Sequence, residues 1–203
     1  MNIKRILRNN VSIIVGQTNT GKSMLLADIA CQYIKEYTGT IYAYGLKKVI
    51  LEALPIIPIS SVVELETIRN GIILIDEVGQ IFDLDNRKQK RLIENTLRQV
   101  THNNNRIIMC GLPTDFKKFL SAKATCFLFK SMTTSDLING SMAKARLLDY
   151  KSEGLGSYVL DLNPNQVLIY EPSERTQYWI DTIRYYERFD TKLGNANLFQ
   201  KRP

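Results

Sequence analysis

Residues 11–37 constrain the fold of this chain more than any other stretch. They open with "VSIIV" (11–15), a β-branched apolar run that predicts a buried strand. The loop "GQTNTGKS" (16–23) follows, and apolar residues at helical spacing then predict a helix over 23–37. A strand, a glycine loop and a helix in this order are typical of the first unit of an α/β fold.

The same alternation continues along the chain. Strands are predicted at 40–45, 71–76, 106–111 and 125–130. Helices are predicted at 47–54, 61–68, 86–102, 114–123 and 134–150, with a turn at Pro55 and Pro58. Strands that alternate with helices indicate a mostly parallel sheet with helices on both faces.

The C-terminal part has a different pattern. The runs "SYVLDL" (157–162) and "VLIYE" (167–171) flank "NPNQ" and predict an antiparallel hairpin. The run "RTQYWIDTIRYYERF" (175–189) predicts a last helix, with Trp179, Ile183 and Tyr186 in the core or in a subunit contact. With 203 residues, the chain is long enough for one well-cored domain but short for two. We therefore expect a single domain over 1–189 and a polar, flexible tail over 190–203.

The glycine loop has the chemistry of a phosphate site. Gly16 and Gly21 allow the dihedral angles that turn several backbone N–H groups inward. The helix that follows adds its N-terminal dipole, which favours anions. In such a loop Lys22 would reach the β- and γ-phosphates, and the Ser23 hydroxyl would bind Mg²⁺. The predicted nucleotide-binding residues are Gly16, Gln17, Thr18, Asn19, Thr20, Gly21, Lys22 and Ser23.

Two acids follow the central strand "IILI". Asp76 and Glu77 come at its carboxyl end, where open α/β sheets bind ligands. Asp76 would hold Mg²⁺ together with Ser23, and Glu77 would orient or deprotonate the attacking water. A water-activating carboxylate favours ATP hydrolysis coupled to mechanical work over phosphate transfer to a small acceptor.

Three arginines are candidates for a group that stabilises charge on the γ-phosphate from a neighbouring subunit. Arg98 in "NTLRQVTHNNNR" is the first choice, followed by Arg91 and Arg106. A solvated helix or loop arginine is the alternative for each of them.

A polar sensor for the γ-phosphate has no clear assignment. The position after the strand "RIIMC" is Gly111, which has no side chain. One of the turn asparagines at 103–105 could instead reach the site.

Charge and cysteine usage narrow the function further. The net charge of +7 and a pI near 9.3 favour polyanionic partners, and "NRKQKR" (86–91) is a basic run that could contact DNA phosphates. No base-reading motif is present, so sequence specificity is not indicated. Cys31, Cys110 and Cys126 are scattered and predict buried, reduced thiols. The apolar runs are too short to span a bilayer and no secretory signal is present, which predicts a cytosolic protein.

The order of these motifs resembles the FtsK/HerA superfamily of pumping P-loop ATPases, over residues 11–171. The motifs that carry the resemblance are "GQTNTGKS" and "IILIDE", followed by the polar helix, "RIIMCGLP", "TCFLFK" and the hairpin. The order is similar to that of the viral branch, the genome-packaging ATPases, whose members also have about this length. One departure is visible: the family usually ends the strand after the acidic pair with a glutamine, where this chain has Cys110 and Gly111.

The resemblance implies a RecA/ASCE-like P-loop fold, with ATP and Mg²⁺ bound at Gly16–Ser23 and Asp76 and water activated by Glu77. It also implies a homo-oligomeric ring, a hexamer or pentamer, that threads double-stranded DNA. A capsid vertex or portal protein would be its partner, in the host cytoplasm or the virion. Two other classes stay open. A protein export or assembly ATPase usually carries a membrane segment, and a small-molecule kinase usually carries an arginine-rich lid, for which 134–150 is a poor match.

Overall fold

A computed structural model describes residues 1–82, 86–116, 120, 122–139, 155–172 and 177–189. Their strands form one eight-stranded sheet in the order β3-β2-β4-β5-β1-β6-β7-β8. The strands are β1 (Val11–Val15), β2 (Ile41–Tyr44), β3 (Ile56–Pro58), β4 (Ile72–Ile75), β5 (Arg106–Gly111), β6 (Cys126–Phe129), β7 (Gln166–Glu171) and β8 (Gln177–Thr182). The first six pair in parallel, whereas β7 is antiparallel to both β6 and β8. The predicted α/β fold, mostly parallel with an antiparallel C-terminal hairpin, is confirmed.

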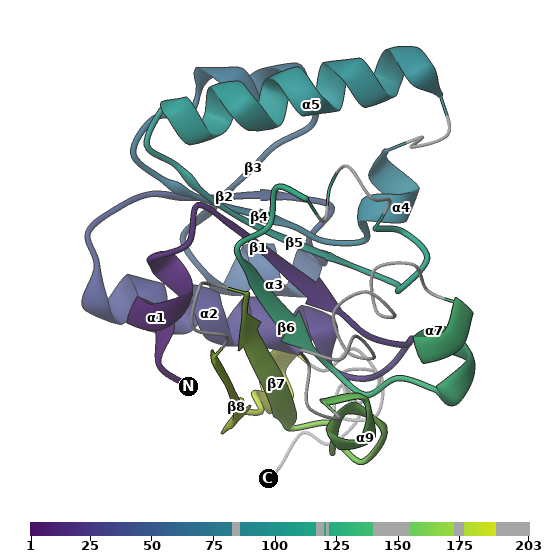
Figure 1. Cartoon of the computed structure of the whole chain (residues 1–203). Helices are drawn as coiled ribbons and strands as arrows, with labels where there is room; N and C mark the ends of the chain where they lie inside the picture. The colour runs from purple at the N-terminus through teal and green to yellow at the C-terminus, as the bar shows by residue number, and fades with distance from the viewer. Residues whose placement is uncertain (83–85, 117–119, 121, 140–154, 173–176, 190–203) are drawn as a thin grey trace, which may run out of the picture.

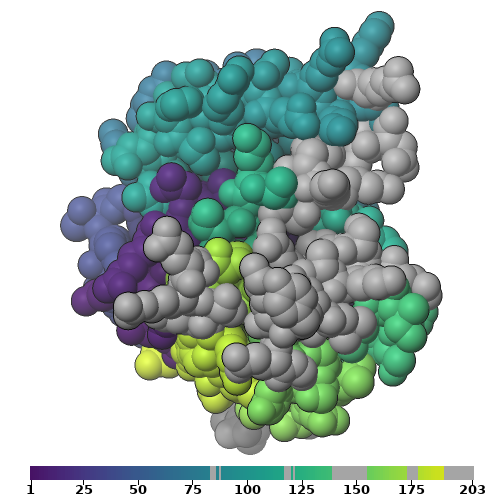
Figure 2. All heavy atoms as spheres, viewed as in Figure 1, coloured from purple at the N-terminus to yellow at the C-terminus, as the bar shows by residue number. Residues whose placement is uncertain are grey.

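Helices cover both faces of this sheet (Figure 1). One face carries α1 (Ile3–Leu7), α2 (Lys22–Glu36) and α3 (Lys48–Ala53), with the short η3 (Glu187–Phe189). The other face carries η1 (Val63–Thr67), α4 (Val78–Ile81), α5 (Arg87–His102), α7 (Thr134–Asn139) and α9 (Leu155–Leu160). The outer side of α5, in teal, lies on the surface of the molecule (Figure 2).

The strand sequences explain the two layers. Side chains alternate across a strand, so Ile13 and Val15 of β1 join the core under α5, while Ile14 joins the core over α2. In β4, Ile73 and Ile75 face one core and their neighbours face the other. Central parallel strands that are buried on both sides need continuous apolar runs, and these runs made them predictable from sequence.

The elements in the first 111 residues agree closely with expectation, apart from four short segments. The short helix α1 was not predicted. The segment 61–68, predicted as a helix, contains only the five-residue 3-10 turn η1. The residues around Pro55 and Pro58, predicted as a turn, form the edge strand β3. An edge strand tolerates proline because its outer side has no ladder hydrogen bonds to make. The short helix α4 directly after the acidic pair was not predicted. The helix expected over 114–123 lies partly outside the described residues, and the helix over 134–150 is described only as α7.

The C-terminal prediction was wrong in its pairing. Residues 157–162 do not form a strand, because most of them belong to the helix α9. The antiparallel partner of β7 is β8, within the run 175–189 that predicted a helix. In β8, Tyr178 and Ile180 are about half exposed, while Trp179 packs against the core. Because both faces of β8 carry apolar side chains, the period of two that marks a strand was hidden.

The core assignment for this segment still holds. Ile183 is buried, and Trp179 and Tyr186 are partly buried against the same core as α2. The guanidinium of Arg5 lies 3.5 Å from the centroid of the Trp179 ring and 3.4 Å from Glu171 Oε2. These contacts attach α1 to the C-terminal hairpin.

Candidate active site

The candidate site lies at the carboxyl ends of β1, β4 and β5. Because β5 lies between β1 and β4, the loop after β1 and the acids after β4 flank the end of β5. A cavity of about 840 Å³ opens there, within the range of small-molecule sites. Its lining comes from the glycine loop and the start of α2, from the segments after β2, β4 and β5, and from the loop before β7 and the segment after β8: Thr18, Asn19, Gly21, Lys22, Ser23, Met24, Lys47, Ile50, Asp76, Glu77, Gly79, Gln80, Gly111, Leu112, Asp115, Pro164, Asn165, Ile183, Tyr185 and Phe189.

The glycine loop presents an anion-binding helix end to this cavity. Gly21 has a φ of 88° and caps α2 without any side-chain hydrogen bond. The first hydrogen bond of the helix runs from Leu25 N to Gly21 O, at 2.9 Å. The N–H groups of Lys22, Ser23 and Met24 therefore have no acceptor within the helix. Free N–H groups at the positive end of a helix dipole fit a phosphate group.

The base of the loop is held against β6. Gln17 N donates to Ser131 O at 3.1 Å. A Cβ on Gly16 would lie 2.5 Å from the Cβ of Lys130 and 2.9 Å from Thr20 Oγ1. Position 16 therefore needs glycine because the loop and the residue after β6 approach each other so closely.

The structure separates the predicted loop residues into two groups. Thr18, Asn19, Gly21, Lys22 and Ser23 line the cavity, whereas Gly16, Gln17 and Thr20 shape the loop from behind. The carbonyl oxygen of Gln17 accepts hydrogen bonds from Lys22 Nζ and Thr20 Oγ1, each at 2.7 Å. The amide group of the Gln17 side chain turns away and donates to both carboxylate oxygens of Asp136 at 2.6 Å.

The two acids after β4 differ in their surroundings. Asp76 is buried at 2 % exposure, and its carboxylate accepts a hydrogen bond from Glu77 N at 3.1 Å. The thiol of Cys110 lies beside it, and burial first and then the charge of Asp76 raise the pKa of this thiol well above its usual value. The thiol is therefore protonated and can donate to Asp76. Glu77 is exposed and has a φ of 53°, a left-handed conformation that is rare for non-glycine residues and clusters at functional sites.

The residues present fit a magnesium nucleotide. Ser23 and Asp76 line the same cavity as the helix end and the Lys22 side chain. In the described part of the chain, no group of three or more His, Cys, Asp or Glu side chains forms a metal cluster. Mg²⁺ needs no such cluster, because one or two protein ligands together with phosphate oxygens and water complete its octahedron.

Two polar residues at this end were missed by the sequence analysis. Lys130 has no exposed surface, and its Nζ donates to the carbonyl oxygens of Pro164 and Gln166, both at 2.5 Å. The only local sign in the sequence that Lys130 is unusual is its position directly after the apolar run "TCFLF" (125–129). Asp115 lines the cavity and accepts a hydrogen bond from Leu112 N at 2.7 Å, in a segment that sequence alone assigned to a helix.

The candidate arginines do not line the cavity of their own chain. Arg98 is exposed on α5, with one guanidinium nitrogen 3.5 Å from Asn95 Oδ1, and Arg91 is exposed on the same helix. Arg106 begins β5 and donates to Leu7 O at 2.9 Å. This position is at the amino end of the sheet, opposite the cavity.

The turn asparagines at 103–105, which the sequence left open as a sensor, do not line the cavity of their own chain. These residues precede β5, so they lie at the amino end of the strand. Asn105 is buried and accepts a hydrogen bond from Gly71 N at 2.9 Å, while its amide group donates to Ile68 O and Val100 O. Its side chain holds the turn between α5 and β5 together. At the cavity end of β5 stands Gly111, where an added Cβ would lie 2.9 Å from Asp115 Oδ2.

Solved structures share this fold. The genome packaging NTPase B204 from Sulfolobus turreted icosahedral virus 2, in complex with AMPPCP, matches with a TM-score of 0.64 at 13 % identity, over 87 % of this chain and 98 % of that one. The fold is that of a P-loop ATPase. The P-loop ATPase fold also relates this chain to the cytoplasmic domain of the type VII secretion ATPase EccC from Thermomonospora curvata, with a TM-score of 0.58, 13 % identity and coverage of 89 % of this chain and 24 % of that one.

A third similar structure is EssC (ATPases 2 and 3) from Geobacillus thermodenitrificans, with a TM-score of 0.53, 12 % identity and coverage of 97 % of this chain and 46 % of that one. No protein-family model and no curated protein matches the chain. The structural similarities show that the chain has the fold of these ATPases, which is the fold that the sequence resemblance implied.

Proposed function

We propose that this protein is an ATP-hydrolysing motor that works as an oligomeric ring and translocates double-stranded DNA, as a viral genome-packaging ATPase does. The observation that carries the proposal is that one cavity is lined by the N-terminal end of α2, by Lys22 and Ser23, and by the acids Asp76 and Glu77. The packaging NTPase B204, which shares the fold, supports the packaging role.

Each residue of the cavity has one task in this proposal. The backbone of Gly16–Ser23 binds the phosphates, and Lys22 moves from Gln17 O to the β- and γ-phosphate oxygens. Ser23 and Asp76 hold Mg²⁺, which supplies positive charge against the phosphates when bound. Glu77 accepts the proton of the attacking water, and its exposed side chain next to the cavity allows this.

Exposed cations on α5 support DNA as the track. Lys88, Arg91 and Arg98 are all exposed on this helix, whose outer side forms part of the molecular surface (Figure 2). The protein carries a net charge of +7. Contacts between such cations and phosphates release counterions, so the binding is independent of sequence and falls with salt. Exposure would also let Arg98 reach the nucleotide of a neighbouring subunit in the ring.

The remaining parts of the proposal concern organisation. The ATPase domain comprises residues 1–189, and the tail predicted over 190–203 lies outside the described residues. A capsid vertex or portal protein anchors the ring. The protein then acts in the host cytoplasm or in the virion. In the part of the chain that the structure describes, no helix is long and apolar enough to cross a membrane.

The similarity to the secretion ATPase EccC favours one second candidate, an ATPase that moves protein rather than DNA. Its site chemistry would be the same, because both activities use ATP hydrolysis. Only the response to the translocated polymer separates the two.

Steady-state ATP hydrolysis, with and without long double-stranded DNA at two salt concentrations, tests the proposal. DNA that stimulates hydrolysis at low salt and much less at high salt supports the DNA motor. Hydrolysis that is indifferent to DNA at both salts favours the protein-moving ATPase, and no hydrolysis of ATP under any condition contradicts both.

A pair of variants sharpens this test. The double variant Lys88→Ala/Arg91→Ala removes two exposed cations from α5, so DNA stimulation should need a higher DNA concentration. The log–log salt slope should fall by about one for each DNA phosphate that the variant no longer neutralises. Lys35→Ala removes an exposed cation from α2 and serves as the control. Equal DNA dependence in the two variants would exclude α5 as the DNA-binding surface.

A further inference from the structure

The cavity has a second, apolar end beyond the phosphate-binding loop. Met24 follows Ser23 on α2, and Ile50 belongs to α3. Ile183, Tyr185 and Phe189 come from the segment after β8, more than 130 residues further along the chain. Ile183 and Phe189 are buried at 4 % and 3 % exposure, whereas Tyr185 is 53 % exposed at the cavity. None of the described residues at this end carries a carboxylate.

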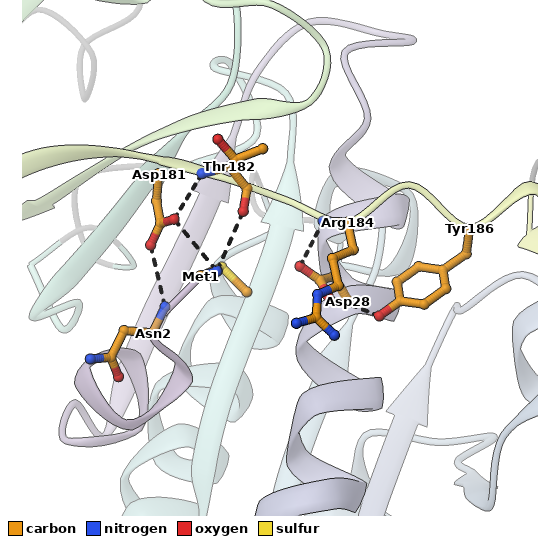
Figure 3. A network of polar contacts seen from close by, with 7 residues as sticks. All are labelled: Met1, Asn2, Asp28, Asp181, Thr182, Arg184 and Tyr186. Carbon is orange, nitrogen blue, oxygen red and sulfur yellow. Dashed lines mark hydrogen bonds and ion pairs between the residues drawn. The ribbon is translucent and has the colours of Figure 1, made fainter.

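Asp28 attaches the segment after β8 to α2. It lies one turn beyond Met24 on the same side of the helix, because residues four apart share a helix face. Its side chain has no exposed surface and accepts hydrogen bonds from Arg184 N and from the hydroxyl of Tyr186, both at 3.1 Å (Figure 3). These two anchors flank Tyr185 on both sides.

The anchors are strong for a physical reason. A carboxylate that accepts hydrogen bonds out of contact with water holds its donors about twice as firmly as a neutral acceptor does. Burial, and then the negative charge of Asp28, raise the pKa of Tyr186 to about 12. The phenol hydroxyl therefore keeps its proton and remains a donor to Asp28 at any pH near neutrality.

Other contacts hold the chain just before this segment. Ile183 N donates to Asn165 O at 2.8 Å. The N-terminal amine of Met1 lies 3.4 Å from Thr182 O and 3.5 Å from Asp181 Oδ1, and Asn2 N donates to Asp181 Oδ2 at 3.3 Å (Figure 3). These contacts fix the direction in which the chain leaves β8 toward the cavity. Asp28 then fixes the position of residues 184–186.

We propose that residues 183–189 form the wall that holds the base and ribose of the nucleotide, and that Asp28 is the positioning residue that keeps this wall in place. The inference rests on the proposed function, because it assumes that phosphates occupy the Gly16–Ser23 loop. The ligand class is a purine nucleoside triphosphate whose base stacks on apolar and aromatic side chains. Ile183, Tyr185 and Phe189 are the residues of this wall that line the cavity, whereas Glu187 does not line it. Without a lining carboxylate to pair with the guanine N1–H and amino group, the wall should bind ATP and GTP with affinities within about tenfold.

Binding of ATP, GTP and inorganic tripolyphosphate to the full chain tests the proposal, with Mg²⁺ present and calorimetry as the readout. Tripolyphosphate occupies the phosphate loop but has no base, so it reports on the loop alone. Asp28→Ala and Tyr185→Ala should weaken ATP binding about 5- to 100-fold, the range for loss of one aromatic stacking partner. Tripolyphosphate binding should change less than about twofold, which also shows that the variants fold.

Conservative variants show whether Asp28 positions the segment 183–189 or only stabilises the folded protein. In Asp28→Asn, the amide oxygen can accept from Arg184 N while the amide N–H donates to the Tyr186 oxygen, so ATP binding should stay close to that of the wild type. Tyr186→Phe removes only one anchor and should weaken ATP binding by a smaller factor than Asp28→Ala. Tyr178→Phe makes the same chemical change on β8, outside the cavity, and should have no effect.

Three results would count against these ideas in distinguishable ways. If Asp28→Ala weakens ATP and tripolyphosphate binding equally, Asp28 supports α2 and its loop as a whole, and the base wall is refuted. If neither ligand is affected, the segment 183–189 does not touch the base. If the wild-type protein binds neither ATP nor tripolyphosphate, the proposed function itself has failed.

Discussion

Lys130 gives the sharpest quantitative prediction in this structure. Its side chain is fully buried directly after β6, and its ammonium group contacts only the carbonyl oxygens of Pro164 and Gln166 among the hydrogen-bond partners that the structure describes. Burial lowers the pKa of Lys130 from 10.5 to about 8. A neutral amine still has two N–H donors, so both hydrogen bonds can survive loss of the proton. Burial raises the free energy of the charged ammonium form of Lys130 relative to the neutral amine.

The magnitude follows from linkage between protonation and folding. Between about pH 8 and pH 10.5 the unfolded chain binds a proton that the folded protein has released, so the free energy of unfolding rises with pH in this window. The lowered pKa corresponds to about 3 kcal/mol in total, most of which is regained between about pH 7 and pH 10. Lys130→Met has a similar shape but no group that titrates.

The assay is urea denaturation of the wild type and Lys130→Met at about pH 7, 8, 9 and 10. The difference in unfolding free energy should shift by about 2 to 3 kcal/mol in favour of the wild type as the pH rises. Its value at pH 7 is not part of the prediction, because relief of the buried charge opposes the loss of two carbonyl partners at about 1–3 kcal/mol each. The exposed Lys35→Met variant controls for the other titrating groups.

A difference between wild type and Lys130→Met that stays constant within about 0.5 kcal/mol over this pH range would refute the reasoning. It would mean that Lys130 has an ordinary pKa, and so that the ammonium is far better solvated than its burial indicates. The Lys35→Met difference should be flat in either case.

Three further predictions concern the loop and the acids. Lys22→Ala should abolish ATP binding or turnover, and near-normal turnover in a steady-state assay would remove the phosphate loop from the site. Glu77→Gln should still bind ATP in a filter or calorimetric assay but hydrolyse it at least about a hundredfold more slowly, and an unchanged rate would exclude Glu77 as the general base. Gly16→Ala should cost about 1–3 kcal/mol of unfolding free energy, because its Cβ would lie 2.5 Å from that of Lys130; an unchanged urea midpoint would show that the loop and β6 can separate freely.

The central part of the fold could be predicted because its signals are local. The runs "VSIIV", "GIILI" and "RIIMC" are continuous and apolar, as buried parallel strands require. Residues that follow such strands share one edge of the sheet, so the glycine loop and the acids at 76 and 77 could be expected together. The structure brings both groups to one cavity, as this argument implies.

An antiparallel C-terminal hairpin was predicted, but the strand that pairs with β7 was assigned to the wrong segment. The strand β8 has apolar side chains on both faces, so its composition suits a helix or a strand equally well. Pairing with β7, together with the contact of Arg5 on Trp179, selects the strand. Local propensity allows residues 177–182 to form either a helix or a strand, and their packing against the rest of the protein selects the strand.

The sequence by itself determined the chemistry of the glycine loop, because the start of α2, Lys22 and Ser23 are neighbours in the chain and need no distant contact to come together. Tertiary structure alone decided the other end. The contact of Asp28 with Arg184 joins residues 156 positions apart, and the contact of Lys130 with Pro164 joins residues 34 apart. A lone acid in a helix and a lone lysine after a strand carry no local sign of such partners. The roles of Asp28 and Lys130 follow from their burial. Because water is excluded, each charged group depends on the hydrogen-bond partners that the fold places beside it.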